Sequence, residues 1–279
     1  MQIGQNHMKN SVKYYSQNNR IRWLYIVGIV FLGVSAVLGI ILGSTSLSIS
    51  EIAEAFQKGF NASAGTRIFA YSRLPRTLAS LMCGAALAVS GAVIQGVLAN
   101  RLASPSIIGV NAGAGLAVTV CTALGIYGGW QLSFFSFIGA FAAVMLVSFG
   151  AKHWGASRGT VILIGVAMNS LLGAISDTII TFIPEVSVMS NDFKIGEFSS
   201  ITYPKLIPAT VTILIVIVIL STLHNELDVL TLGEENAQGL GLNTSVMRTL
   251  FLLFAALLSG CAVSLAGLLS FVGLLVPHA

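Results

Sequence analysis

The sequence predicts an all-α fold, a polytopic helix bundle in a membrane, and three observations lead to this prediction. The chain has 279 residues, of which 55% are hydrophobic and only 9% are charged. Its mean hydropathy is +0.89. A soluble domain carries about 25% charged residues, so this chain has too few to cover a water-facing surface. Its apolar residues also fall into runs of about 20, the length that a helix needs to cross a bilayer.

Seven such runs are separated by polar or turn-forming segments, and an eighth begins near Ser270. The predicted spans are residues 22–43, 75–99, 107–126, 133–151, 159–183, 205–223 and 248–268. The segments between them are expected to be loops: 44–72, 100–106, 128–129, 152–158, 184–204 and 224–247. Residues 1–21 are interpreted as a cytoplasmic tail, because a slight excess of Lys and Arg falls on that side of the membrane. The membrane domain then runs from residue 22 to residue 279.

Composition and motifs exclude several functions. The formal net charge of +4 is spread along the chain, without the dense basic run that nucleic-acid binding needs. The three cysteines lie within apolar runs, which disfavours a disulfide framework. The sequence contains no phosphate loop, HExxH motif or Cys cluster, so neither ATP cleavage nor a metal centre is expected in this chain. The histidines lie outside the predicted spans or at the chain's end, where they could not ligate a haem within helices.

Small residues are spaced four apart along several predicted helices, so they fall on one face of each helix. In lipid, close approach of two backbones through small residues is what holds a bundle together. We therefore expect packing along these stripes, although any tightly packed membrane bundle would show them. The stripes are Gly84, Ala88, Ala92 and Gly96 in the second span, Gly109, Gly113 and Ala117 in the third, and Ala256, Gly260 and Ser264 in the seventh.

Two short matches suggest an internal repeat. The tripeptide Arg-Thr-Leu occurs at 76–78 and 248–250, and Ala-Val-Ser occurs at 88–90 and 262–264, at offsets of 172 and 174 residues. Because five crossings separate the second span from the seventh, the two copies would point in opposite directions. Such an inverted repeat is typical of transporters that work by alternating access. Chance identity in apolar sequence of low complexity is the alternative.

Two polar side chains, Asn169 and Asp177, lie within the fifth predicted span. A polar or ionisable residue in a span is a functional candidate, so both are candidates for a translocation path. Asp177 is also near enough to the outer loop to reach water. Asn169 equally suits a hydrogen bond between helices.

Three motifs resemble the permease subunits of ABC importers for iron–siderophore complexes, haem and cobalamin. RLPRTLASLMCGAALAVSGAVIQGVLANRLASPSIIGVNAGAG (73–115) resembles the family's Arg-x-Pro-Arg start, its Gly-Ala-Ala-Leu-Ala-x-Ser-Gly run and its Asn-Pro-Leu-Ala-x-Pro turn. LTLGEENAQGLGLNTSVMR (230–248) is similar to the family's cytoplasmic coupling loop. GLLSFVGLLVPHA (267–279) is similar to its F-[VI]-G-L-x-[VI]-P-H segment. The resemblance covers nearly the whole chain.

The sequence departs from the family pattern in three places. Arg101 stands where the family usually has proline, and residues 193–199 lack a tryptophan often found nearby. Family members have about ten helices, whereas the pattern stops here directly after Pro277 and His278. We therefore expect that two to three helices are missing, as in a fragment or a truncated gene.

The resemblance implies roles for two groups of residues. Arg73 and Arg76 match arginines that receive acidic residues of an extracytoplasmic solute-binding protein, and the second span is expected to begin between them at Pro75. Anchoring of these arginines at the membrane surface is the alternative. Residues 224–247 would form the loop that docks on the ATPase, with a solvated loop as the alternative. The coupling residues are Leu232, Gly233, Glu234, Glu235, Ala237, Gly239, Leu240 and Gly241, with a helix from Glu234 and a second short one before Arg248.

The resemblance implies a permease of the bacterial plasma membrane that is not itself an enzyme. It would act as a homodimer, or as a heterodimer with a close paralogue, together with two ATPase subunits and a binding protein. ATP and magnesium would bind to the ATPases, and this chain would hold no cofactor and no nucleic acid. The substrate would be a metal chelate, with a ferric siderophore as first candidate and haem or cobalamin as the others. An ion-coupled secondary transporter is the alternative.

Overall fold

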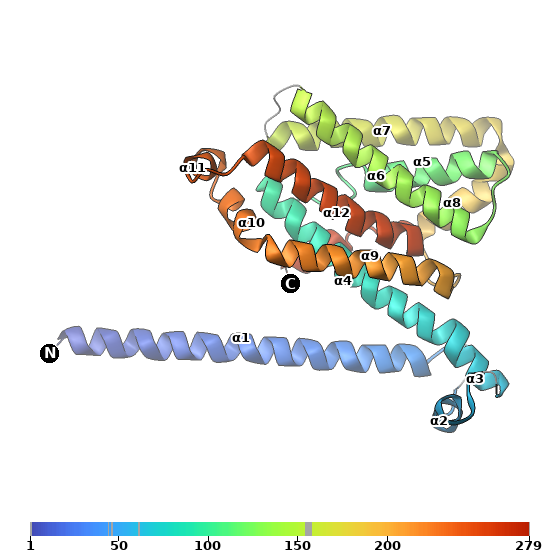
Figure 1. Ribbon diagram of the computed structural model, residues 1–279, viewed down its shortest axis with the longest axis horizontal. Helices are drawn as coiled ribbons and strands as arrows, with labels where there is room; N and C mark the ends of the chain where they lie inside the picture. Colours follow the sequence, from blue (N-terminus) through green and yellow to red (C-terminus); the bar gives the residue numbers. More distant parts are fainter. Residues whose placement is uncertain (1, 44, 46, 61, 154–157, 279) are drawn as a thin grey trace. The chain divides into compact units, whose positions relative to one another are not determined.

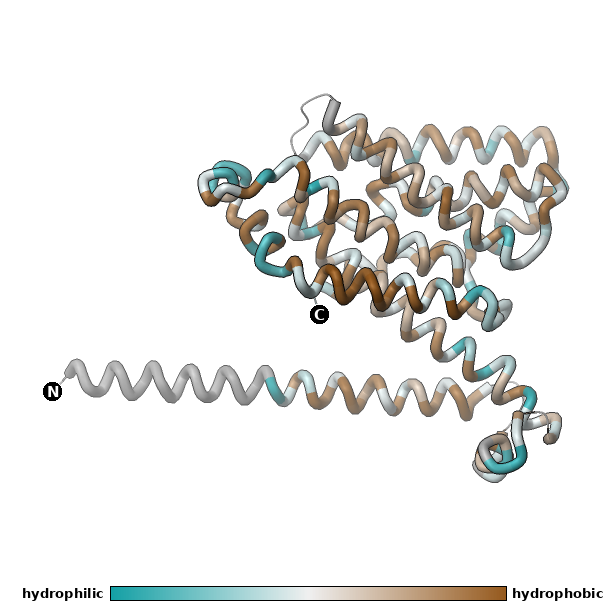
Figure 2. Tube along the Cα trace, viewed as in Figure 1, coloured by the Kyte–Doolittle hydropathy of each residue, from teal (hydrophilic) through white to brown (hydrophobic). Residues whose placement is uncertain are grey.

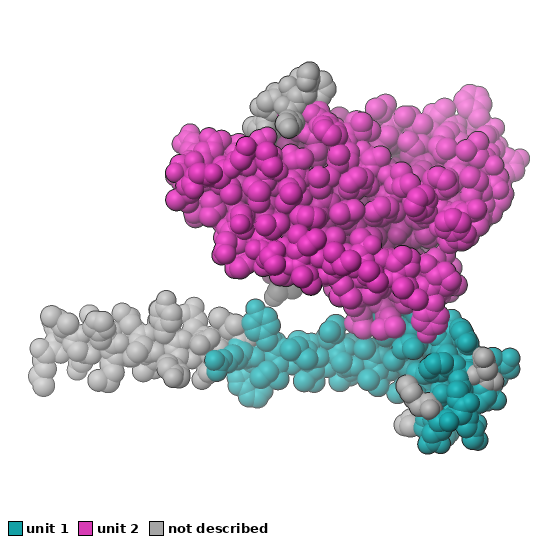
Figure 3. Space-filling model, viewed as in Figure 1, with its two compact units in different colours: residues 1–77 teal, residues 78–279 magenta. Residues whose placement is uncertain are grey.

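The computed structural model describes residues 2–43, 45, 47–60, 62–153 and 158–278, and every regular element among them is a helix (Figure 1). The helices form two compact units, residues 1–77 and residues 78–279, which we call unit 1 and unit 2 (Figure 3). The predicted all-α class is confirmed.

Unit 1 contains α1 (Gln2–Ile41), α2 (Ile49–Lys58), α3 (Ala64–Ile68) and the π-helical segment η1 (Phe69–Arg73). The prediction that residues 44–72 form a loop is wrong, because α2, α3 and most of η1 lie there. The helix α2 begins with a capping box, in which Ser48 and Glu51 each accept a hydrogen bond from the other's backbone N–H. A small buried cluster holds these elements together and consists of Leu47, Ala55, Phe69 and Ala70.

The second span does not begin at Pro75, as the sequence predicted. The helix is continuous from Ala64 to Leu98, through η1 and then α4 (Leu74–Leu98). A proline inside a helix removes a hydrogen bond, and its ring clashes with the preceding turn. The wider π-helical turn directly before Pro75 accommodates the ring. As a result, Arg73 lies inside a helix and not at a helix start.

Unit 2 contains most of α4 and eleven further elements. They are α5 (Val110–Ala123), α6 (Gly129–His153), α7 (Arg158–Phe182), η2 (Pro184–Val186), α8 (Ser187–Ile195), α9 (Tyr203–Thr222), α10 (His224–Thr231), α11 (Glu234–Gly239), α12 (Thr244–Ala266), α13 (Val272–Leu275) and η3 (Val276–His278). The short helices α10 and α11 lie at one end of the unit and α8 at the other (Figure 1). We call these the α11 end and the α8 end. Polar residues gather at both ends, and the helices between them are mostly apolar (Figure 2).

Six helical stretches are long and apolar enough to cross a membrane: 22–41, 64–98, 129–151, 159–182, 203–222 and 244–266. They match six of the seven predicted spans. The remaining prediction, 107–126, corresponds to the shorter helix α5, because the backbone only becomes helical after Gly109, which has φ +100°. The predicted loops 184–204 and 224–247 contain α8, and α10 with α11, respectively. Near the predicted start of an eighth span, α13 begins at Val272.

The helices α4 and α12 cross in opposite directions, and their contacts show the inverted repeat. Ser90 Oγ of α4 donates a hydrogen bond to Ala255 O of α12 at 2.8 Å. Cys83 Sγ donates to Ala262 O at 3.6 Å. Cys83 and Ala255 are 172 residues apart, and so are Ser90 and Ala262. The two Arg-Thr-Leu copies are also 172 residues apart. Moving each residue of one contact to its counterpart in the other copy therefore gives the other contact, as a two-fold axis between inverted copies requires.

The small-residue stripe predicted in the third span does pack against a neighbouring helix. A Cβ atom added to Gly113 of α5 would collide with the backbone carbonyl of Gly139 in α6. At Gly109 the same added atom would lie 3.5 Å from the Cβ of Ala143. The two helices therefore approach to backbone contact here, which only small residues allow.

Along α4, the predicted stripe is not the face that packs within this chain. Gly84 has open space around it, Ala92 is exposed and Ala88 is half-buried. Gly96 does make a contact, because a Cβ there would lie 3.4 Å from the side chain of Leu227. The neighbouring face is the one that α12 and α13 cover, and its buried residues include Ala86, Ser90, Gly91 and Val97. Because small residues occur on both faces of α4, their spacing alone did not identify the packed one.

Replacing Gly91 by alanine is expected to destabilise the bundle, because the added Cβ would collide with the carbonyl of Gly273. Overpacking of this kind costs about 1–3 kcal/mol. The matched control is Gly84→Ala on the same helix, since nothing lies within 4 Å of a Cβ there. The melting temperature of each purified variant in detergent is the measurement. Equal melting temperatures for the two variants would contradict the packing described here.

Candidate functional site

At the α11 end, two short helices link α9 to α12. Gly233 joins α10 to α11 with φ +107°, a conformation that glycine adopts without strain. Leu230 and Ala237 are buried and anchor the segment on the bundle. The predicted helix after Gly233 is confirmed, with Glu234 and Glu235 in its first turn, where the helix dipole favours acidic side chains.

Polar contacts tie α11 to the start of α12. Arg248 Nη2 lies 2.8 Å from Glu234 Oε2, and the Arg248 side chain is only 13% exposed. Thr244 Oγ1 donates a hydrogen bond to Glu234 Oε1 at 3.4 Å. Gln238 Nε2 donates to Thr244 Oγ1 at 3.1 Å. A displacement of α11 would therefore act directly on the first turns of a membrane-spanning helix.

The prediction of a second short helix before Arg248 is wrong. The helix α11 ends at Gly239, Gly241 takes φ +84°, and α12 already begins at Thr244. Two apolar side chains remain uncovered at this end, since Leu232 is 59% exposed and Leu240 is 67% exposed. The other exposed members of the predicted coupling set are Glu235, Gly239 and Gly241.

The structure does not bring Asn169 and Asp177 together. Asn169 lies in the middle of α7, and its Nδ2 donates hydrogen bonds to Ser106 O at 2.8 Å and Ile107 O at 3.1 Å. Its amide therefore supplies hydrogen bonds to carbonyls of the non-helical segment before α5. Asp177 is exposed nearer the α8 end, with Lys194 Nζ at 3.6 Å. Among the described residues, no three His, Cys, Asp or Glu side chains are placed to hold a metal ion.

In unit 1, Arg73 and Arg76 have different surroundings. Arg73 is only 7% exposed, and its guanidinium donates hydrogen bonds to the carbonyls of Ile40, Leu42 and Thr45. These carbonyls belong to the last turn of α1 and the residues after it, where a helix leaves its C=O groups without partners. Arg76 is exposed. Of the two predicted docking arginines, only Arg76 is accessible in this structure.

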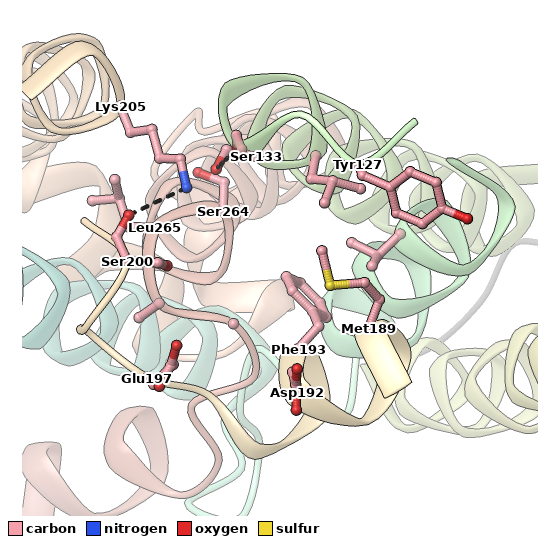
Figure 4. A pocket seen from close by; sticks show the side chains of 15 residues that line it. Tyr127, Ser133, Met189, Asp192, Phe193, Glu197, Ser200, Lys205, Ser264 and Leu265 are labelled. Atoms are coloured by element: carbon pink, nitrogen blue, oxygen red, sulfur yellow. Dashed lines mark hydrogen bonds between the residues drawn. The ribbon is translucent and has the colours of Figure 1, made fainter. Parts of the chain in front are cut away.

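At the α8 end, side chains line a pocket of about 240 Å³ (Figure 4). Its walls come from the loop after α5, the start of α6, α8, the segment leading into α9, and the end of α12. The sequence analysis did not identify this pocket, because its residues come from segments far apart in the chain. One signal was present: Lys205 is a charged residue just inside an apolar span.

Replacing Glu234 by glutamine is expected to lower the melting temperature in detergent, because it removes the charge that faces the largely buried Arg248. The loss is expected to be about 1 kcal/mol, since the Glu234 side chain is partly exposed. Glu235→Gln is the matched control, one residue along the same helix and exposed. The ion pair would have no structural role if both variants melted at the wild-type temperature.

Comparisons with known proteins agree with this architecture. Residues 29–279 match the model of the FecCD transport family. The chain is 35% identical over 275 residues to the uncharacterized ABC transporter permease protein YvrB of Bacillus subtilis, covering 94% of this chain and 78% of that protein. It is 36% identical over 216 residues to the vitamin B12 import system permease protein BtuC of Yersinia enterocolitica, covering 76% of this chain and 64% of that one.

A third relative and a solved structure extend the comparison. The chain is 32% identical over 253 residues to the ferric enterobactin transport system permease protein FepD of Escherichia coli, covering 90% of this chain and 75% of that one. The structure is similar to that of a metal-chelate type ABC transporter in an inward-facing conformation, with a TM-score of 0.79 and 28% identity. That match covers 90% of this chain and 78% of the other.

These matches extend over most of the chain and include both the α4–α12 crossing and the α11 end. The family model alone covers residues 29–279, and the membrane spans fit a multi-pass protein of the bacterial inner membrane. The chain belongs to the FecCD transport family, the membrane permease subunits of ABC importers.

Proposed function

We propose that this chain forms the translocation path of an ATP-driven importer for a metal chelate, with a ferric siderophore as first candidate and haem or cobalamin as the others. The observation that carries this proposal is the family match over residues 29–279. Relatives are named for ferric enterobactin and for vitamin B12, and the similar solved structure is described as a metal-chelate transporter. Their shared chemistry is a bulky chelated metal.

The α11 end is the surface that docks on a separate ATPase subunit, which binds ATP and magnesium. Its two exposed leucines, Leu232 and Leu240, are apolar anchors of the kind that a short helix presents to a groove. The buried residues Leu230 and Ala237 hold the segment in place. Closure of the ATPases would push α11, and the ion pair between Glu234 and Arg248 would pass the movement to α12.

The exposed face of α7 supports a path between two copies of the permease, identical or paralogous. Ser170, Ala174 and Thr178 recur every four residues on this face and are exposed. Both hydroxyls are satisfied within the helix, since Ser170 Oγ donates to Val166 O at 3.2 Å and Thr178 Oγ1 to Ala174 O at 2.7 Å. Small, mildly polar side chains on this face suit the passage of a large chelate without tight binding, and the charged, exposed Asp177 lies on the same face nearer the α8 end.

The alternative is an ion-coupled secondary transporter, which would place coordinating groups near the membrane midplane. Asn169 is the amide side chain at that depth in α7, and its Nδ2 donates hydrogen bonds to two backbone carbonyls. Asp177 is exposed and faces Lys194. Both side chains are thus engaged in contacts that an ion-binding role would have to break, which favours the ATP-driven importer.

Uptake into proteoliposomes tests the proposed function. The full-length protein is reconstituted with an ATPase and a solute-binding protein from its gene cluster, and a ferric siderophore, haem and cobalamin are offered in parallel. Uptake of one chelate that requires ATP and persists when ion gradients are collapsed is expected. Uptake driven by an ion gradient without ATP would identify a secondary transporter instead.

Leu240→Asp is expected to weaken binding of the ATPase at least about tenfold, because it puts a charge where an apolar anchor enters the partner. The permease itself is expected to remain folded, since Leu240 is exposed. Leu124→Asp at the α8 end is the control, with a leucine that is 73% exposed. The dissociation constant of the ATPase on permease in nanodiscs is measured. If Leu240→Asp and Leu124→Asp bind the ATPase equally well, the coupling surface lies elsewhere.

Arg76→Glu and Arg73→Glu are expected to have different effects. Arg76 is exposed, so its reversal weakens docking of the binding protein, most strongly at low salt, while the permease stays folded. Arg73→Glu removes three hydrogen bonds to carbonyls and sets a carboxylate against them, so less folded protein is recovered. Size-exclusion profiles and docking affinity in nanodiscs separate the two. Unchanged docking by a folded Arg76→Glu variant would remove Arg76 from the docking surface.

A further inference from the structure

Two neighbouring cavities lie at the α8 end. The first is the pocket of about 240 Å³ between the ends of α8 and α12, which we call the Lys205 pocket. The second has a volume of about 280 Å³ and lies along the first turns of α6 and α9, and we call it the α6–α9 groove. Ser133, Lys205 and Ser264 line both cavities. One molecule can therefore occupy the two together.

The Lys205 pocket carries charges of both signs on opposite sides. Lys205 extends into it from the start of α9, and Asp192 and Glu197 lie across from it (Figure 4). Lys205 Nζ donates to Ser200 O at 3.4 Å, and an ammonium group has three protons to donate. None of the three charged side chains takes part in an ion pair among the described residues. Because a group of single charge would be attracted by one side and repelled by the other, the pocket suits a group that carries both charges.

The backbone that carries the two carboxylates is fastened to α12. Glu197 N donates a hydrogen bond to Ala266 O at 2.7 Å, and Leu268 N donates to Phe193 O at 3.0 Å. Phe193 directly follows Asp192 in the chain. The acidic side of the pocket is therefore a defined feature of the fold.

The α6–α9 groove is mostly apolar. Its three hydroxyl groups, on Ser133, Thr212 and Ser264, each donate to a backbone carbonyl of their own helix. The residues that line it extend over two turns of each helix, about 10 Å. They include Trp130, Phe134 and Phe137 on α6, and Lys205, Pro208 and Thr212 on α9. The groove therefore suits a hydrocarbon chain, with the charge of Lys205 at one end.

The two cavities lie at the depth where lipid headgroups meet the hydrocarbon of the membrane. The spans of α6 and α9 both begin at this end, at Gly129 and Tyr203. Trp130 is 63% exposed and Tyr127 is 55% exposed, and Trp and Tyr gather at the membrane–water interface. The groove therefore runs from the headgroup level into the hydrocarbon region.

We propose that the Lys205 pocket and the α6–α9 groove together bind one phospholipid with a zwitterionic headgroup of the phosphatidylethanolamine type. An acyl chain lies in the groove, the phosphate pairs with Lys205, and the primary ammonium faces Asp192 and Glu197. The order of these groups along the lipid is the order of their partners in the protein, because Lys205 stands where groove and pocket meet. The proposal goes beyond the importer function and does not depend on it.

Other phospholipids fit the two cavities less well. Phosphatidylglycerol also offers a phosphate to Lys205, but it brings no cation to Asp192 and Glu197. Phosphatidylcholine carries a cation, but its quaternary ammonium has no proton to donate to a carboxylate. Charge-assisted hydrogen bonds are about twice as strong as neutral ones. The site is therefore expected to select the primary ammonium.

Titration of the delipidated permease in detergent with these three lipids, followed by native mass spectrometry, tests the proposal. The three lipids carry identical dioleoyl chains, so only their headgroups differ. We expect phosphatidylethanolamine to bind about tenfold more tightly than phosphatidylglycerol and about threefold more tightly than phosphatidylcholine. This comparison uses the wild-type protein and needs no variant.

Two variants assign the selectivity to the pocket. Lys205→Met is expected to weaken binding of phosphatidylethanolamine about tenfold, because it removes the partner of the phosphate. The double variant Asp192→Asn, Glu197→Gln is expected to bring phosphatidylglycerol within about twofold of phosphatidylethanolamine, because it removes the charges that distinguish them. The matched control is Lys194→Met, since Lys194 lines neither cavity and pairs with Asp177. Melting temperatures identify which variants are folded.

Four outcomes would overturn the proposal. Equal affinities of the wild-type protein for the three lipids would show that the headgroup is not recognised. Tight binding of phosphatidylethanolamine that neither folded pocket variant weakens would place the lipid elsewhere on the protein. An effect of Lys205→Met without any effect of the double variant would leave recognition of the phosphate alone. Competition by glycerophosphoethanolamine, the headgroup without acyl chains, at the concentration of the lipid itself would remove the groove from the site.

Discussion

The lack of water in the bilayer core is the constraint on which the rest of this structure depends, because each backbone N–H and C=O there must find a partner inside the protein. The long helices satisfy their own groups. Residues 104–109 are not helical, yet they lie beside the middle of α7, and Asn169 supplies hydrogen bonds to two of their carbonyls. Similarly, Gln95 Nε2 donates to Leu274 O in α13. Polar residues inside this bundle are thus used to support broken helices.

Close backbone approach is the second requirement, and it follows from the first. A short side chain such as Ser90 reaches a carbonyl on the facing helix only where the two backbones nearly touch. The contacts of Ser90 and Cys83 with α12 correspond to each other under the inverted repeat. The α4–α12 crossing therefore has one hydrogen bond to a backbone carbonyl on each side of its centre. This crossing forms the centre of unit 2, whereas α7 and the α11 end leave apolar side chains exposed.

The cations of the chain fall into two groups, those that bind groups within the chain and those that do not. Arg73 binds the carbonyls at the end of α1, and Arg248 pairs with Glu234. These cations are used within the chain. Arg76 is exposed, and Lys205 lines a pocket and takes part in none of the three ion pairs among the described residues. An arginine at a helix junction and a lysine at a span start look alike in sequence, and only their neighbours in space show which of them is used within the chain.

The sequence by itself determined the helical class, six of the membrane spans, the α11 helix after Gly233 and the inverted repeat, because these depend on local composition and on spacing along one helix. It did not determine which face of α4 packs, since small residues lie on two faces and only the positions of α12 and α13 select one. It also placed Arg73 at an exposed helix start, because the π-helical turn that accommodates Pro75 leaves no clear trace in local sequence. The pocket around Lys205 was decided by tertiary structure alone. Its walls come from segments that are distant in the chain and meet only through the backbone hydrogen bonds between the ends of α8 and α12.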